Sequence, residues 1–447
     1  MKTKYTFLLF LFYIQIVYSQ SWQQQTTPAI SNNNLLRTIT AITPEDIWAA
    51  GFKTENNGNQ LNLVLHFDGN EWNEIQMSNP GNDMNDIWGL SAISENEIWA
   101  AGVYNPPGTA TQMQIQKWDG NEWSIYPAPT LTGGSFLYSI KAISGNDIWA
   151  VGTRMSREDY GPMECLSMHW DGNEWNEIPV PPVGTRRNSF RAVDGINSDD
   201  VWAVGHWTDQ LGFFIPLAMH WNGNEWINYT ISGGDELVNV YMISTNDVWA
   251  VGGGQFFHYD GNVWQQVNSP GGGSTVIKST TGRIFSLGAN VVEWINNQWE
   301  LVADLSDIIA PAVTSAAVLP NGRIVAAGRK FVSTQTYSNL IVEFTGGNNT
   351  TGVADDYKPR EFQLHQNYPN PFNPSTVIEY EIKNPDIVKI KVYNVLGKEI
   401  CEMLNEYKNE GNYKIHFNAL PTMTAGVYYY QITSGNFRET KKMILLR

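Results

Sequence analysis

Four histidines recur at matching places in the sequence and together could bind a metal ion, because neutral imidazole is a common metal ligand. They are His66, His169, His220 and His258, and each lies just ahead of a turn that reads Asp-Gly-Asn or Asn-Gly-Asn. Ligands of one metal must converge in space, whereas equivalent positions of a repeat point away from one another. Other copies of the repeat carry a different residue there, at Lys117, Glu293 and Glu343. We therefore predict a structural role for the histidines and no metal site.

Carboxylates in the longer connecting segments could supply the acid and base of a glycoside hydrolase, which needs two facing carboxyl groups. They are Glu55, Asp83, Asp86, Glu158, Asp159, Glu164, Asp209, Asp235 and Glu236. Their spacing selects no two of them. The sequence contains no P-loop, nucleophile elbow, zinc-binding helix or dinucleotide fingerprint, so no cofactor is predicted. The two cysteines, Cys165 and Cys401, are too few for a disulfide framework.

A repeat supplies the elements that must position these residues. The motif "DIWAAG" at Asp46 returns in altered form at Glu97, Asp147, Asp200, Asp247, Arg283 and Arg323, with the central residues about 36 to 53 positions apart. That period is typical of propeller blades. A second motif, "WDGNEW" and its variants, sets a glycine turn between two aromatic-rich runs, which indicates a hairpin. In the third unit "SIKAIS", "IWAVG", "LSMHW" and "EWNEI" predict four short strands. We therefore predict an all-β, seven-bladed propeller.

The seventh unit lacks a fourth strand at its own place in the chain. It ends at "LIVEFTGG" from Leu340, and no tryptophan follows Trp299. The missing strand matches the start of the chain after residue 20, because "WQQQTTP" at Trp22 aligns with "WQQVNSP" at Trp264 and shares its tryptophan, two glutamines and proline. We predict that this opening segment completes the last blade and closes the ring, which removes an unpaired strand edge.

Alignment of the first strands predicts a candidate ligand site. The connections between strands two and three and between blades are long and variable, and loops on a rigid scaffold commonly carry function. Around the channel mouth on that face the alignment places Arg37, Trp88, Tyr138, Arg191, Val238, Ser274 and Thr314, with Arg186, Arg187, Trp207, Phe213 and Phe214 on the loops. Arginine forks and aromatic rings suit a carbohydrate or an acidic group.

The ligand-binding candidates are Arg37, Trp88, Tyr138, Arg191 and Trp207; the alternative is that they only cap the blades and hold the loops. Sixteen of the 18 tryptophans occupy repeat positions that packing between blades explains, and only Trp88 and Trp207 do not.

Residues 1–19 have the features of a signal peptide. Lys2 and Lys4 precede an apolar run from Tyr5 to Tyr18, and small residues lie before Gln20 as a cleavage site requires. The run is short for a bilayer span, and no later segment is a membrane candidate. The net charge is −16, with about 19 net negative charges between residues 20 and 352, which disfavours nucleic acid as a partner. We expect an exported monomer.

A second domain follows the repeat. Residues 346–358 form a Gly, Asn, Thr and Asp-rich linker between the propeller at 20–345 and a region at 359–447 whose alternating runs predict a small Ig-like β-sandwich. Four motifs in this region, "NYPNPFNPSTVIEYEI", "VYNVLGKEI", "AGVYYYQI" and "KKMILLR", together resemble the type A C-terminal sorting domain of the type IX secretion system. The resemblance implies a Gram-negative source, recognition by the secretion machinery, passage across the outer membrane and, commonly, removal of the domain after export. The propeller repeats resemble those of uncharacterised secreted bacterial propellers.

Three functions for the propeller remain open at this point. It is predicted to bind a ligand, a glycan or a surface protein, on its variable face outside the cell. The alternative is a carbohydrate-active hydrolase or lyase with a carboxylate pair at the channel mouth, and a structural surface component is a third possibility. Fold alone does not choose between them.

Overall fold

The computed structural model describes residues 21–30, 33–155, 162–184, 186–304, 311–332, 336–345, 363–367, 370–382, 386–408, 411–420, 423–435 and 437–446. The predicted leader at 1–19 and linker at 346–358 lie outside these ranges. All the regular secondary structure in the described ranges is β-strand. These ranges therefore include no helix that could cross a membrane. The chain divides into two compact units, residues 1–349 and 350–447.

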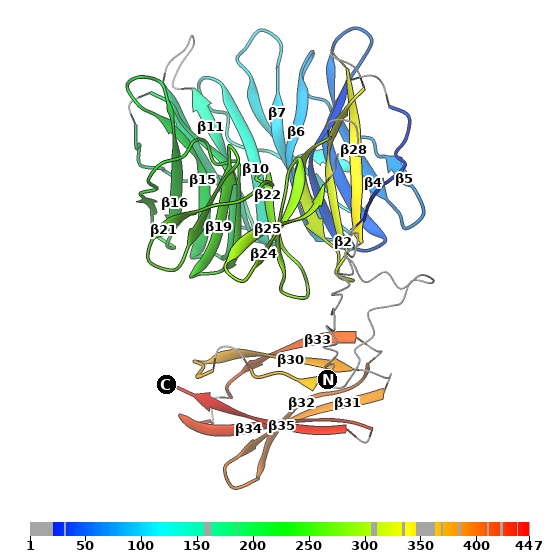
Figure 1. Cartoon of the computed structure of the whole chain (residues 1–447), viewed down its shortest axis with the longest axis vertical. Coiled ribbons are helices and arrows are strands. Elements are labelled where there is room, and N and C mark those ends of the chain that lie inside the picture. Colours follow the sequence, from blue (N-terminus) through cyan, green and yellow to red (C-terminus); the bar gives the residue numbers. More distant parts are fainter. Residues whose placement is uncertain are drawn as a thin grey trace, which may run out of the picture. The chain divides into compact units, whose positions relative to one another are not determined.

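The first unit is a seven-bladed β-propeller in which each blade is a sheet of four antiparallel strands. The sheets stand side by side (Figure 1). Blade 1 has β2 (Asn34–Thr43), β3 (Asp46–Thr54), β4 (Gln60–Phe67) and β5 (Trp72–Glu74). Blade 2 has β6 (Asn85–Ser94), β7 (Glu97–Tyr104), β8 (Gln112–Trp118) and β9 (Trp123–Ile125). Blade 3 has β10 (Ser135–Ser144), β11 (Asp147–Met155), β12 (Met163–Trp170) and β13 (Trp175–Glu177).

The other four blades follow the same plan. Blade 4 has β14 (Asn188–Asn197), β15 (Asp200–Thr208), β16 (Phe214–Trp221) and β17 (Trp226–Tyr229). Blade 5 has β18 (Asn239–Ser244), β19 (Asp247–Gly252), β20 (Gln255–Tyr259) and β21 (Trp264–Val267). Blade 6 has β22 (Thr275–Lys278), β23 (Ile284–Leu287), β24 (Asn290–Ile295) and β25 (Gln298–Asp304). Blade 7 has β26 (Pro311–Val318), β27 (Ile324–Phe331), β28 (Tyr337–Thr345) and, from the start of the chain, β1 (Ser21–Gln24).

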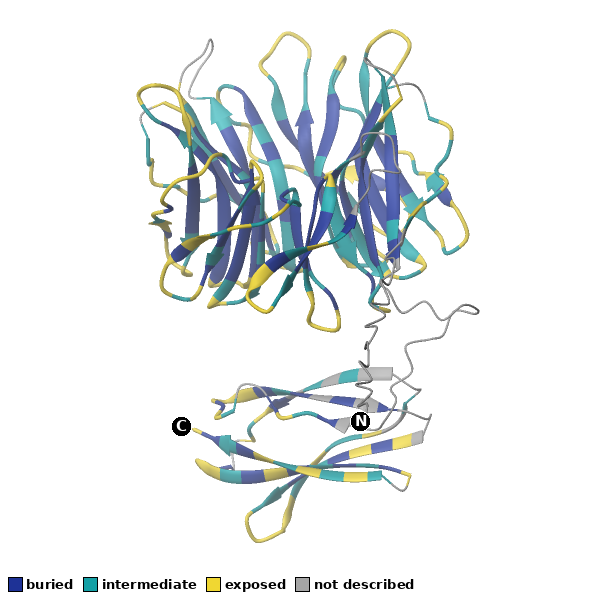
Figure 2. Cartoon of the chain, in the orientation of Figure 1, coloured by how far each residue is buried: buried dark blue, intermediate teal, exposed yellow. Residues whose placement is uncertain are grey.

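The cores of the propeller lie between blades. Seven hydrophobic clusters each join two neighbouring sheets, and the repeated tryptophans of the second strands are almost fully buried in them. One cluster joins Leu36 and Ile39 of blade 1 to Val325 and Ile341 of blade 7. Buried residues follow the middle of the strands, and exposed residues concentrate at the turns (Figure 2). Burial of apolar surface between sheets is therefore the main stabilising force.

The predicted pairing of the two ends of the propeller is confirmed. β1 pairs antiparallel with β28, with Trp22 opposite Phe344, and the centroids of these two rings are 4.9 Å apart. Trp22 packs against the cluster shared by blades 6 and 7. Thr345, where the chain leaves the last blade, therefore lies at the same end of the sheet as Ser21 and the short β26–β27 turn.

The recurrent histidines pair within their own blades. His66, His169, His220 and His258 each place Nε2 within 2.7 to 2.9 Å of the aspartate that opens the second strand. Each imidazole also lies against the blade's buried tryptophan, with ring centroids 4.1 to 4.8 Å apart. In blade 2 Lys117 pairs with Glu97 in the same way. In blades 6 and 7 the two charges are swapped: the cation stands at the second strand and the carboxylate on the third. Arg283 pairs there with Glu293, and Arg323 with Glu343. These residues thus hold the second and third strands together.

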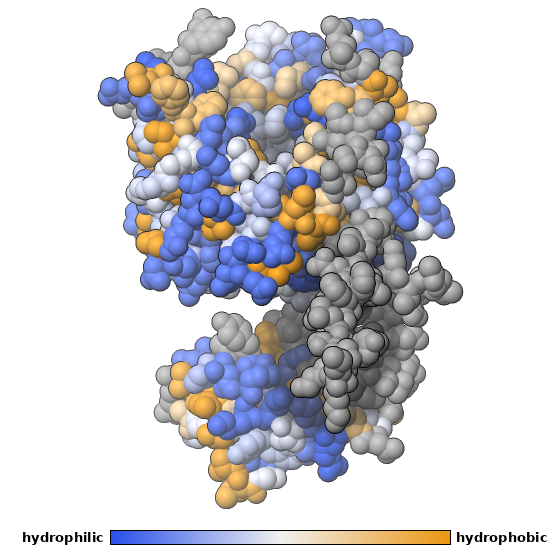
Figure 3. Space-filling model, viewed as in Figure 1, coloured by the Kyte–Doolittle hydropathy of each residue, from blue (hydrophilic) through white to orange (hydrophobic). Residues whose placement is uncertain are grey.

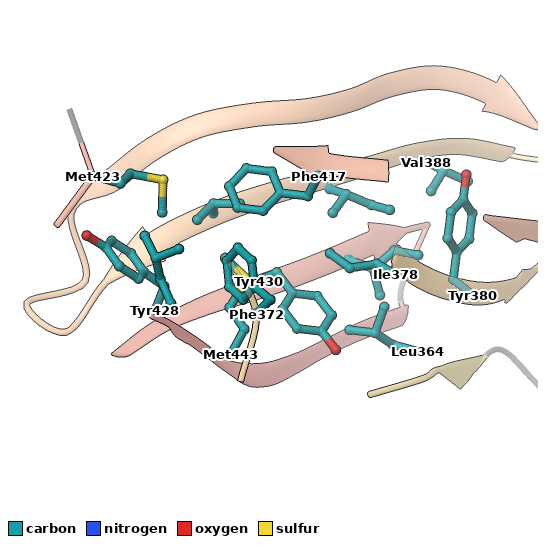
Figure 4. Packing of buried hydrophobic residues seen from close by; sticks show 14 of the residues in the cluster. Leu364, Phe372, Ile378, Tyr380, Val388, Phe417, Met423, Tyr428, Tyr430 and Met443 are labelled. Carbon is teal, nitrogen blue, oxygen red and sulfur yellow. The ribbon is translucent and has the colours of Figure 1, made fainter. Parts of the chain in front are cut away.

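The second unit is a two-sheet β-sandwich, as predicted. One sheet has β29 (Gln363–Leu364), β30 (Ser375–Ile382) and β33 (Gly411–Asn418). The other has β31 (Asp386–Asn394), β32 (Glu399–Lys408), β34 (Gly426–Ser434) and β35 (Phe437–Leu445). Phe372, Ile378, Tyr430 and Met443 point into the core between the sheets (Figure 4). The buried Tyr430 hydroxyl donates a hydrogen bond to the backbone oxygen of His365, so its polar atom is satisfied.

Candidate functional site

A β-bulge in the first strand of several blades creates the candidate site. The ladder between the first and second strands skips Arg37, Trp88, Tyr138, Arg191 and Thr314 in blades 1, 2, 3, 4 and 7. A bulged residue has no partner in the ladder, and the local bend re-aims its side chain. Four of the five residues predicted to bind a ligand are therefore bulge residues, which is why they share a structural position in different blades.

The glycine of the repeated motif makes room for the bulge. A Cβ on Gly51, Gly102, Gly152, Gly205 or Gly328 would lie 1.9 to 2.1 Å from the carbonyl oxygen of the residue two positions before the bulge residue. In blade 5 a Cβ on Gly252 would lie 2.0 Å from that of Glu236, two positions before the aligned Val238. Atoms that are not bonded cannot approach so closely, so only glycine fits there. The glycine in "IWAVG" thus connects the repeat to the geometry of the candidate site.

Arg37 is held by the neighbouring blade. Its Nε donates to Oδ1 and Oδ2 of Asp86 at 2.9 and 2.8 Å, and its Nη2 lies 2.7 Å from Oδ2. The guanidinium carbon is 3.5 Å from the centre of the Trp88 ring and 5.4 Å from that of Phe52. The Asp86 side chain is only 2% exposed. A charged pair and an aromatic ring are therefore stacked at the junction of blades 1 and 2.

A second charged pair lies at the junction of blades 4 and 5. Arg191 donates a hydrogen bond from Nε to Oε1 of Glu236, and the same oxygen lies 2.9 Å from Nδ1 of His206. The Arg191 guanidinium carbon is 4.4 Å from the centre of the Tyr138 ring. Tyr138 in turn meets Trp88 edge to face, with centroids 5.0 Å apart. A continuous chain of side-chain contacts thus joins seven residues across blades 1 to 5. We call these residues the arginine–aromatic cluster: Arg37, Asp86, Trp88, Tyr138, Arg191, Glu236 and His206.

The two carboxyl groups of the arginine–aromatic cluster have opposite electrostatic environments. Burial raises the pKa of Asp86 to about 6, although the charge of Arg37 and its hydrogen bonds oppose the shift. Burial also acts on Glu236, but the hydrogen bond from His206 and the charge of Arg191 outweigh it and lower the pKa of that carboxyl. Burial raises the pKa of the Tyr138 hydroxyl, so this group stays protonated at neutral pH. The hydroxyl is therefore available as a hydrogen-bond donor.

The structure does not bring Trp207 to the arginine–aromatic cluster. Trp207 packs with the core between blades 3 and 4, and its ring lies close against Gly184. Of the remaining aligned positions, Thr314 donates its hydroxyl to the backbone oxygens of Leu36 and Ala327, and Val238 is exposed. Sequence reasoning did not single out His206, and it placed Asp86 and Glu236 only among many loop carboxylates.

The other sequence-predicted carboxylates are scattered. Glu164 pairs with Arg154, and Asp209 accepts hydrogen bonds from the backbone N–H groups of Leu211 and Phe213 in its own loop. Glu158 and Asp159 lie outside the described residues. Within the described ranges, no group of three or more His, Cys, Asp or Glu side chains is placed to hold a metal ion.

An apolar loop borders the arginine–aromatic cluster. Asp209 caps the turn that leads into β16, and this turn leaves Leu211, Phe213 and Phe214 exposed. The Phe214 ring lies against His206, with centroids 4.3 Å apart. Most of the described surface in Figure 3 is hydrophilic, with smaller hydrophobic patches between. The loop therefore adds apolar area beside a group of charged and aromatic side chains.

Comparison with known proteins identifies the second unit. Residues 366–446 match the secretion system C-terminal sorting domain family. The chain therefore carries a type IX sorting domain, and this domain indicates export to the outer surface or the medium and recognition by the type IX machinery.

Solved structures give distant likenesses to this chain. A protein of unknown function from Dyadobacter fermentans DSM 18053 is 14% identical with a TM-score of 0.45, over 72% of this chain and 98% of that one. The apo form of soluble aldose sugar dehydrogenase from Escherichia coli is 10% identical with a TM-score of 0.37, over 59% and 98%. A subtype N11 neuraminidase-like protein of A/flat-faced bat/Peru/033/2010 is 9% identical with a TM-score of 0.33, over 75% and 96%. These likenesses are too distant to indicate a function. No curated protein matches the chain.

Proposed function

We propose that the propeller is an extracellular binding module for a carbohydrate, which contacts the arginine–aromatic cluster and the adjoining loop. Arg37, Arg191 and Glu236 supply planar groups that can exchange paired hydrogen bonds with neighbouring hydroxyls, and the buried Asp86 holds Arg37 in place. Trp88 and Tyr138 supply ring surface for the apolar faces of a sugar. Sites of this kind combine aromatic walls with a few fixed polar groups.

The asymmetry of the ring carries this proposal. The same bulge position holds Arg37, Trp88, Tyr138 and Arg191 in four consecutive blades. In blades 5 to 7 the aligned residues are Val238, Ser274 and Thr314, so a blade of this fold needs neither charge nor an aromatic ring there. Partly buried ion pairs are also a poor way to stabilise a fold, because their desolvation offsets much of their attraction. A role in recognition explains why one side of the ring concentrates them.

The position of the chain's exit supports display of this surface. The arginine–aromatic cluster lies at the bulged ends of the first strands, near the start of β2, whereas Thr345 lies at the opposite end of its blade beside the short turns. The chain thus leaves the last blade at the end of the propeller that lies away from the arginine–aromatic cluster. We further propose that residues 1–19 are removed as a signal peptide in a Gram-negative host before the type IX step.

Glycan binding by the purified full chain tests the proposal. We expect binding to members of a panel of neutral and acidic polysaccharides, with Arg191→Met or Trp88→Ala weakening it about tenfold or more. Arg154→Met is the matched control, because Arg154 pairs with Glu164 and Glu177 on blade 3 outside the arginine–aromatic cluster. Equal binding by Arg191→Met, Trp88→Ala and wild type would refute the site.

A second function, carbohydrate hydrolysis, is favoured by one observation. The pKa of Asp86 is raised to about 6 while that of Glu236 is lowered, and a separation of this kind distinguishes the acid from the base in hydrolases. The burial of Asp86 and its bidentate pairing with Arg37 favour binding over catalysis, since an acid must reach its substrate. Release of reducing ends that stops in both Asp86→Asn and Glu236→Gln would establish hydrolysis instead.

A further inference from the structure

The tip of the β31–β32 hairpin in the sorting domain is a hydrogen-bonded turn. The Oδ1 atom of Asn394 accepts hydrogen bonds from the backbone N–H groups of Leu396 and Lys398, each at 3.0 Å. The backbone of Asn394 exchanges two further bonds with Gly397 and Lys398, also at 3.0 Å. Gly397 has a φ of 74°, which side chains other than glycine rarely tolerate. The two residues between Asn394 and Gly397 are therefore held in one orientation.

These two residues are apolar and exposed. Leu396 is 87% and Val395 64% exposed, and no other large apolar side chain in the described residues is as exposed as Leu396. Neither belongs to the hydrophobic cluster of the sandwich or packs against it. Three residues earlier on the same hairpin, Val392 is fully buried. A turn of this type needs only Asn394 and Gly397, so polar residues at 395 and 396 would serve the fold equally well.

The surroundings of the tip favour a protein partner with an apolar pocket. On the stem of the hairpin Lys391 lies 2.9 Å from Glu399 and 3.5 Å from Glu402. With Lys398 beside the turn, these four charges sum to zero and give no net attraction for an ionic surface. Exposed apolar side chains ringed by polar residues are typical of an interaction site. Docking of a small apolar projection into a pocket is also how a few residues supply most of a binding energy.

We propose that Val395 and Leu396 dock into an apolar pocket of the type IX secretion machinery. The partner follows from the match of residues 366–446 to the sorting domain family, because recognition by this machinery is the task of the domain and the tip lies inside the match. The proposal is independent of any ligand of the propeller. The sandwich core holds the fold, and the hairpin tip makes the contact that selects the chain for export.

Export of the full chain in its native host tests this contact. Burial of one leucine changes an affinity by about ten- to a hundredfold, so Leu396→Asn should slow the appearance of the protein outside the cell by about tenfold and leave it in the periplasm. Leu420→Asn is the matched control, because Leu420 is an exposed leucine of another turn in the same domain. Leu396→Met keeps an apolar side chain and should export at the normal rate.

Two results would overturn the proposal. One is export of Leu396→Asn at the wild-type rate. The other is equal slowing in Leu396→Asn and Leu420→Asn, which would show a general response to polar substitution. Melting of each purified full chain separates docking from folding: the tip variant should melt as wild type does. If it melts lower, Leu396→Met decides, because slow export of that variant would contradict an apolar contact.

Discussion

Replacement of Gly102 by alanine tests the link between the repeated motif and the candidate site. The added Cβ would lie 2.1 Å from the carbonyl oxygen of Asp86, whereas real Cβ atoms essentially never lie within 3.0 Å of another non-bonded heavy atom. The strand that carries Asp86 and Trp88 must therefore retreat by about 0.9 Å, the difference between these two distances. Overpacking costs about 1 to 3 kcal/mol where side chains can adjust. Here the obstacle is backbone, so we expect a loss of about 3 kcal/mol.

Calorimetry of the purified chain measures this loss. For a domain larger than 250 residues, about 3 kcal/mol corresponds to a fall in melting temperature of roughly 5 °C. Gly134→Ala is the control, because the nearest atom to its added Cβ is 3.5 Å away, and it should melt within about 1 °C of wild type. If Gly102→Ala melts with the control, the bulge does not depend on the close approach of the two strands, and the proposed reason for the glycine is wrong.

Three further predictions concern the ring, the buried carboxyl and the sorting domain. Trp22→Ala should lower the free energy of unfolding by about 3 kcal/mol, the lower end for a large aromatic residue because Trp22 is only partly buried; urea denaturation checks this, with Gln23→Ala as control. The pKa of Asp86 rises from 3.8 to about 6 on folding, so the folded state binds the carboxyl proton more tightly than the unfolded state does. The protonated carboxyl therefore stabilises the fold by about 3 kcal/mol below pH 3.8, and this stabilisation disappears as the pH rises through 6. In Asp86→Asn this part of the pH dependence should vanish from denaturation curves measured between pH 4 and 7. A chain that ends before Phe362 should keep a folded propeller yet remain in the periplasm, and immunoblots of medium and periplasm would contradict this if the truncated chain were exported normally.

The blades were predictable because their signals are local. A glycine turn between aromatic runs and a tryptophan in each second strand identify a hairpin within a few residues, whatever the rest of the chain does. The origin of β1 was predictable for the same reason, since Trp22 begins a copy of the segment at Trp264. In the sorting domain β32 carries a weaker signal. Its ladder with β31 is interrupted twice by irregular register, so its side chains do not alternate regularly.

The partners in the arginine–aromatic cluster could not be predicted, because they depend on contacts between blades. Alignment places Arg37 and Arg191 at equivalent positions of their blades but cannot tell which of nine carboxylates each one meets. That choice depends on the bulge, which turns each arginine toward the next blade and its Asp86 or Glu236. Trp207 was selected because it also stands outside the repeat. It follows the motif glycine Gly205 near the end of β15, opposite Ile215, and its ring packs into the core.

Comparison of equivalent positions separates structural residues from candidate functional ones in this propeller. Where the second and third strands meet, every blade has one cationic or imidazole side chain and one carboxylate, and in blades 6 and 7 they merely exchange strands. The pair is retained although its order is not, as expected if only its mutual attraction matters. At the bulge the reverse holds, since the backbone geometry is retained while the residues differ from blade to blade. A feature that is present in all seven blades stabilises the ring. A feature that differs on one side of the ring is the better candidate for recognising a ligand, because a ligand lacks sevenfold symmetry.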